Sequence, residues 1–353
     1  MLQLRDKNIA EEIIKKIKAI GLKLKIMHVC GTHQDTIVRH GIDVLLRDIG
    51  IEVIQGPGCP VCVTTTLEIQ KAIELARNGV TIATFGDMLR VPAAGTSLQQ
   101  IRAEGGDVRI VYSIDDAVKL AEEREVVFLG VGFETTAPST AVTLLNTPRN
   151  FSVLSFHRYI PPALDALLGM GEIKIDGIIC PGHVSTIIGI EPYKPISTKY
   201  KIPQVIAGFE PLDILMAVYM IAKQIEEGRH EVENEYIRVV KPEGNLKAKE
   251  AIQKVFHPGD AKWRGFPSIP QSKMLIREEY EEYDAEKKYE DILETIEEAP
   301  EPKGCRCGEV LRGVIYPQEC PLFAKVCKPS NPVGPCMVSI EGACNIEYRY
   351  KND

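Results

Sequence analysis

The chain has 353 residues, of which 44% are hydrophobic and 26% charged, and its formal net charge is −7 at pH 7. This length predicts two or three domains with substantial cores. The acidic balance, without any cluster of Lys or Arg, argues against a nucleic-acid partner. The first twenty residues carry too much charge for a signal peptide, and no apolar run is long enough to span a bilayer, so we expect a cytoplasmic protein without a membrane partner.

In a reducing compartment, the ten cysteines are not expected to form a disulfide framework. Metal binding or thiol redox chemistry is therefore the default expectation for them.

Residues 4–20 are predicted to form an amphipathic helix, because Ile9, Ile13 and Ile17 share one side. A unit of a short apolar strand, a polar loop and usually a helix then recurs eight times. This alternation predicts an α/β fold with parallel sheets covered by helices. The predicted strands are Leu24–Val29, Ile51–Ile54, Val80–Thr84, Val108–Val111, Val126–Val131, Phe151–Phe156, Gly177–Cys180 and Gln204–Ala207.

Eight such units can close into one barrel or form two open sheets of four strands. The short step between the strands that begin at Val108 and Val126 favours two similar domains facing a cleft, at residues 21–120 and 121–240. Residues 241–353 are expected to form a third domain, on which the helix of residues 1–20 packs.

The most informative loop is the turn of residues 56–62, which holds Cys59 and Cys62 among two glycines and two prolines. It follows a predicted strand and precedes a helix that begins with a capping box, Thr65 and Glu68. A nearby helix N-terminus favours thiolate. The spacing indicates redox or metal chemistry rather than two buried structural cysteines.

Two further loops place a histidine three residues after a cysteine, as Cys30 with His33 and Cys180 with His183. Active residues of parallel α/β folds lie at the carboxyl ends of the strands, so these loops share one rim with the Cys59 turn. We therefore expect a thiol–imidazole site there.

The loop after the fifth predicted strand carries Glu134, Thr135 and Thr136, which either line the cleft or cap a helix. Asp87 is likewise either a cap or a site carboxylate. The glycines before Glu134 lack the third glycine of a dinucleotide fingerprint, and no phosphate-binding P-loop occurs, so nucleotide binding is not expected.

Six cysteines fall within the last fifty residues, which indicates a metal site. Zinc modules favour paired C-x-x-C knuckles, and none occurs here. Widely spaced single cysteines suit a cubane iron–sulfur cluster better. Four ligands leave two cysteines for a neighbouring disulfide, and spacing alone does not identify the four. The six are Cys305, Cys307, Cys320, Cys327, Cys336 and Cys344.

Several of these motifs, taken in order, resemble the HypD family of hydrogenase expression/formation proteins over nearly the whole chain. The matching segments are residues 30–33, 56–62, 132–138, 181–184 and 335–344.

The resemblance implies a role in building the iron unit of [NiFe] hydrogenases, which carries two cyanides and one carbon monoxide, Fe(CN)2CO. It implies a complex with a HypC-type chaperone, a HypE-type cyanide donor and, indirectly, the hydrogenase large subunit. It also implies a [4Fe–4S] cluster in the third domain, in an arrangement similar to ferredoxin:thioredoxin reductase. By position, the cluster ligands would be Cys305, Cys320, Cys327 and Cys344, beside a redox-active pair of Cys307 and Cys336.

Within that resemblance, Cys30 is expected to anchor the iron, and Cys59 and Cys62 to cycle between dithiol and disulfide. His33 is expected to move a proton or orient a cyanide. Two function classes stay open: a redox scaffold for metal-centre assembly, and a stand-alone iron–sulfur-driven thiol–disulfide reductase. Whether any step is enzymatic is left undecided.

Overall fold

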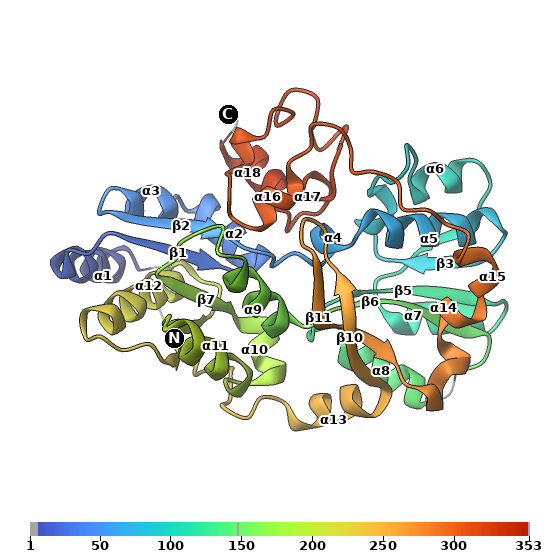
Figure 1. The fold of residues 1–353 in the computed structure, drawn as a ribbon, viewed down its shortest axis with the longest axis horizontal. Helices are drawn as coiled ribbons and strands as arrows, with labels where there is room; N and C mark the ends of the chain where they lie inside the picture. The colour runs from blue at the N-terminus through green and yellow to red at the C-terminus, as the bar shows by residue number, and fades with distance from the viewer. Residues whose placement is uncertain (1–5, 147, 352–353) are drawn as a thin grey trace.

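The computed structural model describes residues 6–146 and 148–351 and has two parallel sheets, one on each side of a central junction (Figure 1). The first sheet has the order β2-β1-β7-β8-β9 and the second the order β4-β3-β5-β6. The prediction of two open parallel sheets rather than one barrel is confirmed.

The eight predicted strands all form, each within one residue of its predicted ends. Most are short apolar runs buried on both faces, whereas the edge strand β4 is partly exposed. The first sheet contains β1 (Leu24–His28), β2 (Ile51–Gln55), β7 (Gly177–Pro181), β8 (Gln204–Ala207) and a ninth parallel strand, β9 (Val232–Asn234). The second contains β3 (Thr81–Thr84), β4 (Val108–Ile110), β5 (Val126–Gly132) and β6 (Phe151–His157).

The predicted division at residue 120 is wrong. After β2 the chain leaves the first sheet, builds all of the second sheet from β3 to β6, and returns to add β7 beside β1. The strand–loop–helix rhythm is the same whether the chain stays in one sheet or crosses to the other, so the pattern cannot reveal the crossing. The two crossings tie the sheets into one unit.

Helices cover both sheets and alternate with the strands as expected. They are α1 (Lys7–Ile20), α2 (Gly31–Arg39), α3 (Ile42–Arg47), α4 (Pro60–Val63), α5 (Thr66–Arg77), α6 (Leu98–Ala103), α7 (Ile114–Ala121), α8 (Ala137–Leu145), α9 (Ile160–Met170), α10 (Gly182–Ile188), α11 (Lys194–Tyr200), α12 (Pro211–Glu226) and α13 (Leu246–Val255). The 3-10 turns η1 (Met88–Arg90) and η2 (Glu191–Tyr193) lie between them. Within the residues described, no helix is both long and apolar enough to cross a membrane.

Helix α1 packs mainly against α12, at the far end of the first sheet (Figure 1). Its buried stripe, Ile13 and Ile17, joins the outer core of that sheet. The expected packing of residues 1–20 on the third domain is therefore wrong, because the apolar stripe of α12 already covers this face; residues 1–5 lie outside the described chain.

A continuous hydrophobic core joins the inner faces of the two sheets and extends into the cysteine-rich region. Met27 and Ile178 of the first sheet belong to it, as do Val127 and Leu129 of the second. A core shared in this way fixes the two sheets relative to each other, which places the ends of their strands around one cleft.

Residues 256–276 form an antiparallel hairpin, β10 (Phe256–Lys262) with β11 (Ser268–Ile276), which the sequence did not predict. Three short helical turns follow, η3 (Glu278–Tyr283), α14 (Ala285–Lys288) and α15 (Glu290–Leu293). The cysteine-rich region, residues 303–351, follows with α16 (Cys307–Leu311), η4 (Pro317–Glu319), α17 (Pro335–Val338) and α18 (Ala343–Lys351), and it lies over the junction of the two sheets (Figure 1).

Candidate functional site

The loop that carries Cys30 and the turn that carries Cys59 lie side by side, because β1 and β2 are paired neighbours in the first sheet. Gly31 donates its backbone N–H to the carbonyl of Gly58, at 3.3 Å. A Cβ atom on Gly58 would lie only 2.2 Å from the backbone nitrogen of Cys30. Glycine at this position is therefore what allows the two loops to approach.

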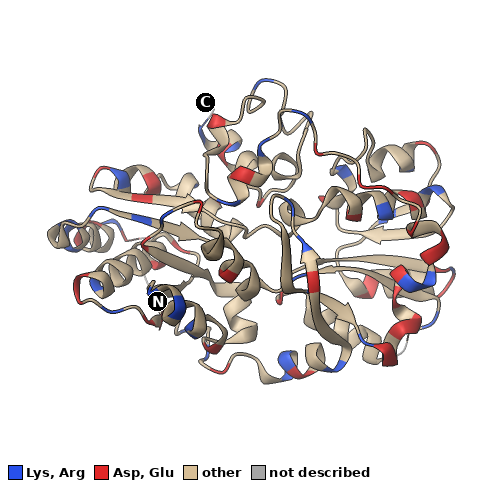
Figure 2. Ribbon diagram, in the orientation of Figure 1, with Lys and Arg blue, Asp and Glu red and all other residues tan. Residues whose placement is uncertain are grey.

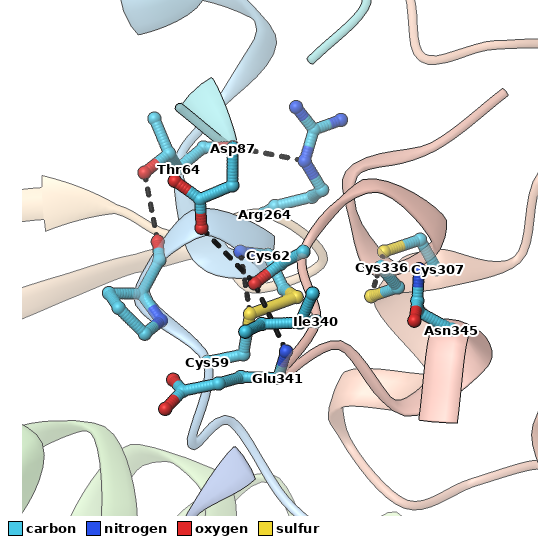
Figure 3. Close-up of a disulfide and its surroundings, with 12 residues drawn as sticks. Cys59, Cys62, Thr64, Asp87, Arg264, Cys307, Cys336, Ile340, Glu341 and Asn345 are labelled. Carbon is cyan, nitrogen blue, oxygen red and sulfur yellow. Dashed lines mark hydrogen bonds between the residues drawn. A yellow bond between two sulfur atoms is a disulfide. The ribbon is translucent and has the colours of Figure 1, made fainter. Parts of the chain in front are cut away.

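Cys59 and Cys62 form a disulfide across the first turn of α4 (Figure 3). Cys59 is the N-cap of this helix, and its sulfur accepts the backbone N–H of Cys62 at 3.2 Å. Both residues are buried. The turn follows β2 and precedes α5, as expected, and it holds the two sulfurs in a disulfide.

A cavity of about 590 Å³ opens beside these loops, between the carboxyl ends of the two sheets. From the first sheet, Cys30 and His183 line it. From the second sheet come Asp87 and Thr135, and from the cysteine-rich region comes Glu341. We call this cavity the cleft. Thiol, imidazole and carboxyl groups from three parts of the chain thus face one space.

Cys30 is the N-cap of α2 and is buried. Burial raises the pKa of its thiol to about 11, while the backbone N–H of His33 and the nearby Glu341 carboxyl act in opposite directions on it. The thiol is therefore protonated at neutral pH, and the helix N-terminus alone does not make it a thiolate. A bound cation would supply the missing stabilisation, because metal coordination requires the deprotonated form.

His33 lies behind Cys30 and does not line the cleft. Its Nε2 lies 3.0 Å from the carbonyl oxygen of Gly208, which identifies Nε2 as the protonated nitrogen. Burial lowers its pKa to about 3, so the ring is neutral, and Nδ1 has no hydrogen-bond partner among the described residues. His33 is thus positioned as an acceptor rather than as a cation.

His183 is exposed at the mouth of the cleft and stacks on Phe209, with the ring centroids 3.9 Å apart. Cys180, its partner in the sequence pattern, is buried and contacts Gln204 instead of the cleft. The two Cys–His loops are therefore not equivalent, since only the first brings its thiol to the cavity.

Glu134 does not line the cleft. Its carboxyl accepts the backbone N–H of Ile160 at 3.1 Å, at the start of α9, and burial raises its pKa to about 8. Of the two interpretations left open, helix capping describes Glu134 and cleft lining describes Thr135 and Thr136.

Asp87 has both roles that the sequence left open. It accepts the backbone N–H of Met88 at 3.0 Å, and it also lines the cleft. Glu341, within the matching segment 335–344, also lines the cleft, and both it and Asp87 hydrogen-bond to Ser339. Burial raises the pKa of each carboxyl, and the pKa of Glu341 is raised further by Asp87. No pattern in the sequence pairs residues so far apart.

The six C-terminal cysteines all line one small cavity in the cysteine-rich region. The sulfurs of Cys307 and Cys336 lie 2.6 Å apart (Figure 3). Helices α16 and α17, which carry this pair, both contact α4. The pair and the Cys59–Cys62 disulfide are therefore on directly packed elements.

Cys305, Cys320, Cys327 and Cys344 are the other four. Burial raises the pKa of the Cys305 and Cys327 thiols, and the neighbouring Cys320 and Cys344 raise both further. In the described part of the chain, no three His, Cys, Asp or Glu side chains converge on the position of a single metal ion. An all-thiol set around one cavity fits an iron–sulfur group by its donor chemistry.

Arg264, at the tip of the β10–β11 hairpin, joins the two cysteine centres. Its guanidinium is buried, donates to the carbonyl of Thr64 at 3.0 Å and pairs with Glu301. Its positive charge also helps to lower the pKa of the Cys307 thiol, after the larger effect of the hydrogen bond with Cys336. The sequence did not predict a role for Arg264, because the alternation of apolar and polar residues that marks a strand is broken in β10 and β11.

The comparisons with known proteins agree over the whole length. The family model HypD, described as the hydrogenase formation hypA family, matches residues 6–351. The chain belongs to the HypD family. A hydrogenase expression/formation protein of Methanocaldococcus jannaschii is 50% identical, with 99% of each chain covered. The hydrogenase maturation factor HypD of Azotobacter vinelandii is 44% identical, over 99% of this chain and 96% of the relative.

A third HypD relative, from Cupriavidus necator, is 42% identical over 99% of this chain and 96% of its own length. Membership of the HypD family, expected from five short motifs, is therefore confirmed. All five of those motifs supply residues of the cleft wall, among them Cys30, Gly58, Thr135, His183 and Glu341.

Proposed function

We propose that this HypD-family chain is a hydrogenase maturation factor that holds the iron of the Fe(CN)2CO unit in the cleft while its ligands are added. The observation that carries the proposal is the convergence of Cys30, the Cys59–Cys62 disulfide and the six-cysteine cavity on packed elements.

Cys30 is the proposed anchor of the iron, which is cargo rather than a resident cofactor. Low-spin iron with cyanide and carbon monoxide suits a soft thiolate. The raised pKa of the free Cys30 thiol means that iron binding displaces a proton. His33 lies on the same helix, and its buried Nδ1 has no hydrogen-bond partner among the described residues. We propose that this nitrogen accepts a hydrogen bond from a protonated group near the iron.

The cysteine-rich region is the proposed source of electrons. Cys305, Cys320, Cys327 and Cys344 would hold a [4Fe–4S] cluster, which supplies electrons one at a time when bound. Cys307 and Cys336 would exchange electrons with Cys59 and Cys62, since α16 and α17 pack on α4. Reduction of the disulfide requires two electrons and two protons.

The proposed partners are a HypC-type chaperone and a HypE-type cyanide donor, and the hydrogenase large subunit receives the iron unit afterwards. The cleft is open at its mouth, where His183 is exposed, so a partner can reach Cys30 from that side.

A stand-alone thiol–disulfide reductase is the second candidate, because an oxidised pair, Cys59 and Cys62, lies on elements packed against a second pair. The two candidates differ in whether iron is bound in the cleft.

Infrared spectroscopy of the anaerobically purified complex with its chaperone separates the two. Cyanide and carbonyl stretching bands from iron outside the cluster support the scaffold. Turnover of a generic disulfide substrate without any partner, in protein lacking those bands, would support the reductase.

A further inference from the structure

A groove outside the cleft runs along the outer wall of the six-cysteine cavity. It has a volume of about 1120 Å³ and lies between residues 92–97, residues 299–303 and residues 330–333. We call it the basic groove. None of the functions discussed so far uses it.

The floor of the basic groove is directly bonded to two of the cysteines. Val333, which lines the groove, donates its backbone N–H to the sulfur of Cys327 at 3.4 Å. Pro302, on the opposite wall, accepts the backbone N–H of Cys305 at 3.0 Å. Cys305 is the least buried of the six cysteines. A molecule in the groove would therefore lie within a few residues of the cysteine centre.

The edge of the groove is positively charged although the whole chain carries −7. Residues 303–334 contain five basic and two acidic side chains. Lys303, Lys325 and Lys328 have no carboxylate partner among the described residues. Arg90 reaches the same edge and donates to the carbonyl of Pro329. Figure 2 shows Lys and Arg segments along the upper loops of this region.

The single carboxylate in the groove wall does not offset this charge. Glu301 is already paired with the buried guanidinium of Arg264, and it accepts the hydroxyl of Thr66 at 3.0 Å. The two other charged side chains in the groove wall, Arg90 and Lys303, are both positive. On the adjoining loop Val326 is 55% exposed, and it offers an apolar contact next to Lys325.

We propose that the basic groove is the docking site of an acidic one-electron carrier protein that supplies electrons to the cysteine-rich region. Most of this chain repels an acidic protein, so a local basic edge steers such a partner to this face. The groove has the charge for that partner and lies against the centre that receives the electrons. This inference rests on the proposed redox role of the six cysteines.

The electron balance requires two encounters. In each encounter one reduced carrier docks, loses one electron and leaves oxidised. Two electrons, with two protons taken from solvent, convert the Cys59–Cys62 disulfide into two thiols.

The test measures binding and disulfide opening separately, with a reduced acidic [2Fe–2S] ferredoxin as the probe. The double variant Lys303→Glu/Lys328→Glu reverses one charge in the groove wall and one on the adjoining loop. Lys15→Glu/Lys18→Glu is the matched control, because both lysines are exposed on α1 and the change in net charge is the same. Kd is measured by calorimetry at low and high ionic strength. Opening of the disulfide is measured by mass after thiol labelling.

We expect the groove variant to weaken the ferredoxin Kd about tenfold or more at low ionic strength. The control should bind as the parent chain does, and high salt should remove the difference. Ferredoxin should open the disulfide more slowly in the groove variant, while a neutral photochemical reductant opens it equally in all three proteins.

Equal Kd values for the groove variant and the parent would overturn the proposal, as would equal rates of opening by ferredoxin. If the groove variant is also slower with the neutral reductant, the milder pair Lys303→Gln/Lys328→Gln replaces it. The rate of opening by ferredoxin is then divided by the rate with the neutral reductant, and a ratio equal to that of the parent would overturn the proposal. Failure of the proposed function appears differently: the neutral reductant would open the disulfide of the parent chain, but no iron-bound cyanide or carbonyl would be found.

Discussion

The two sides of the cleft differ in chemistry. The first sheet supplies sulfur and imidazole, through Cys30 and His183, and the buried Cys59–Cys62 disulfide lies on the turn beside them, whereas the second sheet supplies oxygen, through Asp87 and Thr135. The first side has soft groups that suit iron, and the second has hydrogen-bonding groups that suit its ligands. This difference suits a division of roles in which the first sheet binds the iron and the second positions its ligands, while one hydrophobic core holds the two sheets together.

The largest expected effect is on the sulfur side. Cys59→Ala or Cys62→Ala should reduce hydrogenase maturation to background, because a single remaining thiol cannot cycle through an intramolecular disulfide. Cys180→Ala is the control, since Cys180 is buried in the same sheet but outside the cleft. Hydrogenase activity in a strain that lacks the native protein and carries each variant measures maturation. Normal maturation with Cys59→Ala would contradict the special role of the sulfur side.

The contact between the two sulfur loops should be the most sensitive backbone position. Gly58→Ala places a Cβ 2.2 Å from the backbone nitrogen of Cys30, so we expect a loss of several kcal/mol in the free energy of unfolding. Gly86, in the loop after β3, is the matched position on the oxygen side. A Cβ there would lie 3.7 Å from its nearest neighbour, Ile110, and Gly86→Ala should change stability by less than about 1 kcal/mol.

Urea unfolding of both variants measures the two costs. Equal costs at the two positions would show that close approach of the loops is not special to the sulfur side.

A smaller effect, on the pH dependence of stability, is expected from replacing Glu134, which lies behind the oxygen side of the cleft. Its folded pKa of about 8 lies above the ordinary value of 4.5, so the folded state holds the proton more tightly. Stability contributed by this proton is full below pH 4.5 and is lost as the pH rises to about 8.

Glu134→Gln keeps an acceptor for the N–H of Ile160 and removes the titration. We expect the thermal midpoint of the parent, relative to that of the variant, to fall between pH 5 and pH 8. Glu123→Gln, on an exposed side chain, is the control and should leave the pH profile of the parent unchanged. Parallel profiles for Glu134→Gln and the parent would contradict the raised pKa.

The strands could be predicted from the sequence because each is an apolar run bounded by a polar loop, and Leu24–His28 is typical. The partition of the strands between sheets could not, because crossing from β2 to β3 leaves no mark in the pattern. The β10–β11 hairpin was missed because Pro258 and Gly259 interrupt its first strand and a register shift follows.

The site divides in the same way. Cys30, Cys59 and Cys62 were predictable because strand ends on one sheet converge and thiols are rare enough to be noticed. The carboxyls of Asp87 and Glu341 were not paired in advance, because their proximity depends on how the cysteine-rich region packs over the cleft. Glu134 was assigned to two roles, and only the contact with Ile160 separates them.

The most direct measurement of the central claim is the infrared spectrum of the Cys30→Ala variant, purified anaerobically with its chaperone beside the parent and Cys180→Ala. The account predicts that Cys30→Ala loses the cyanide and carbonyl bands and the iron outside the cluster, while the visible spectrum of the six-cysteine centre is retained. Cys180→Ala should keep both. Undiminished cyanide and carbonyl bands in Cys30→Ala would contradict the assignment of Cys30 as the anchor of the iron.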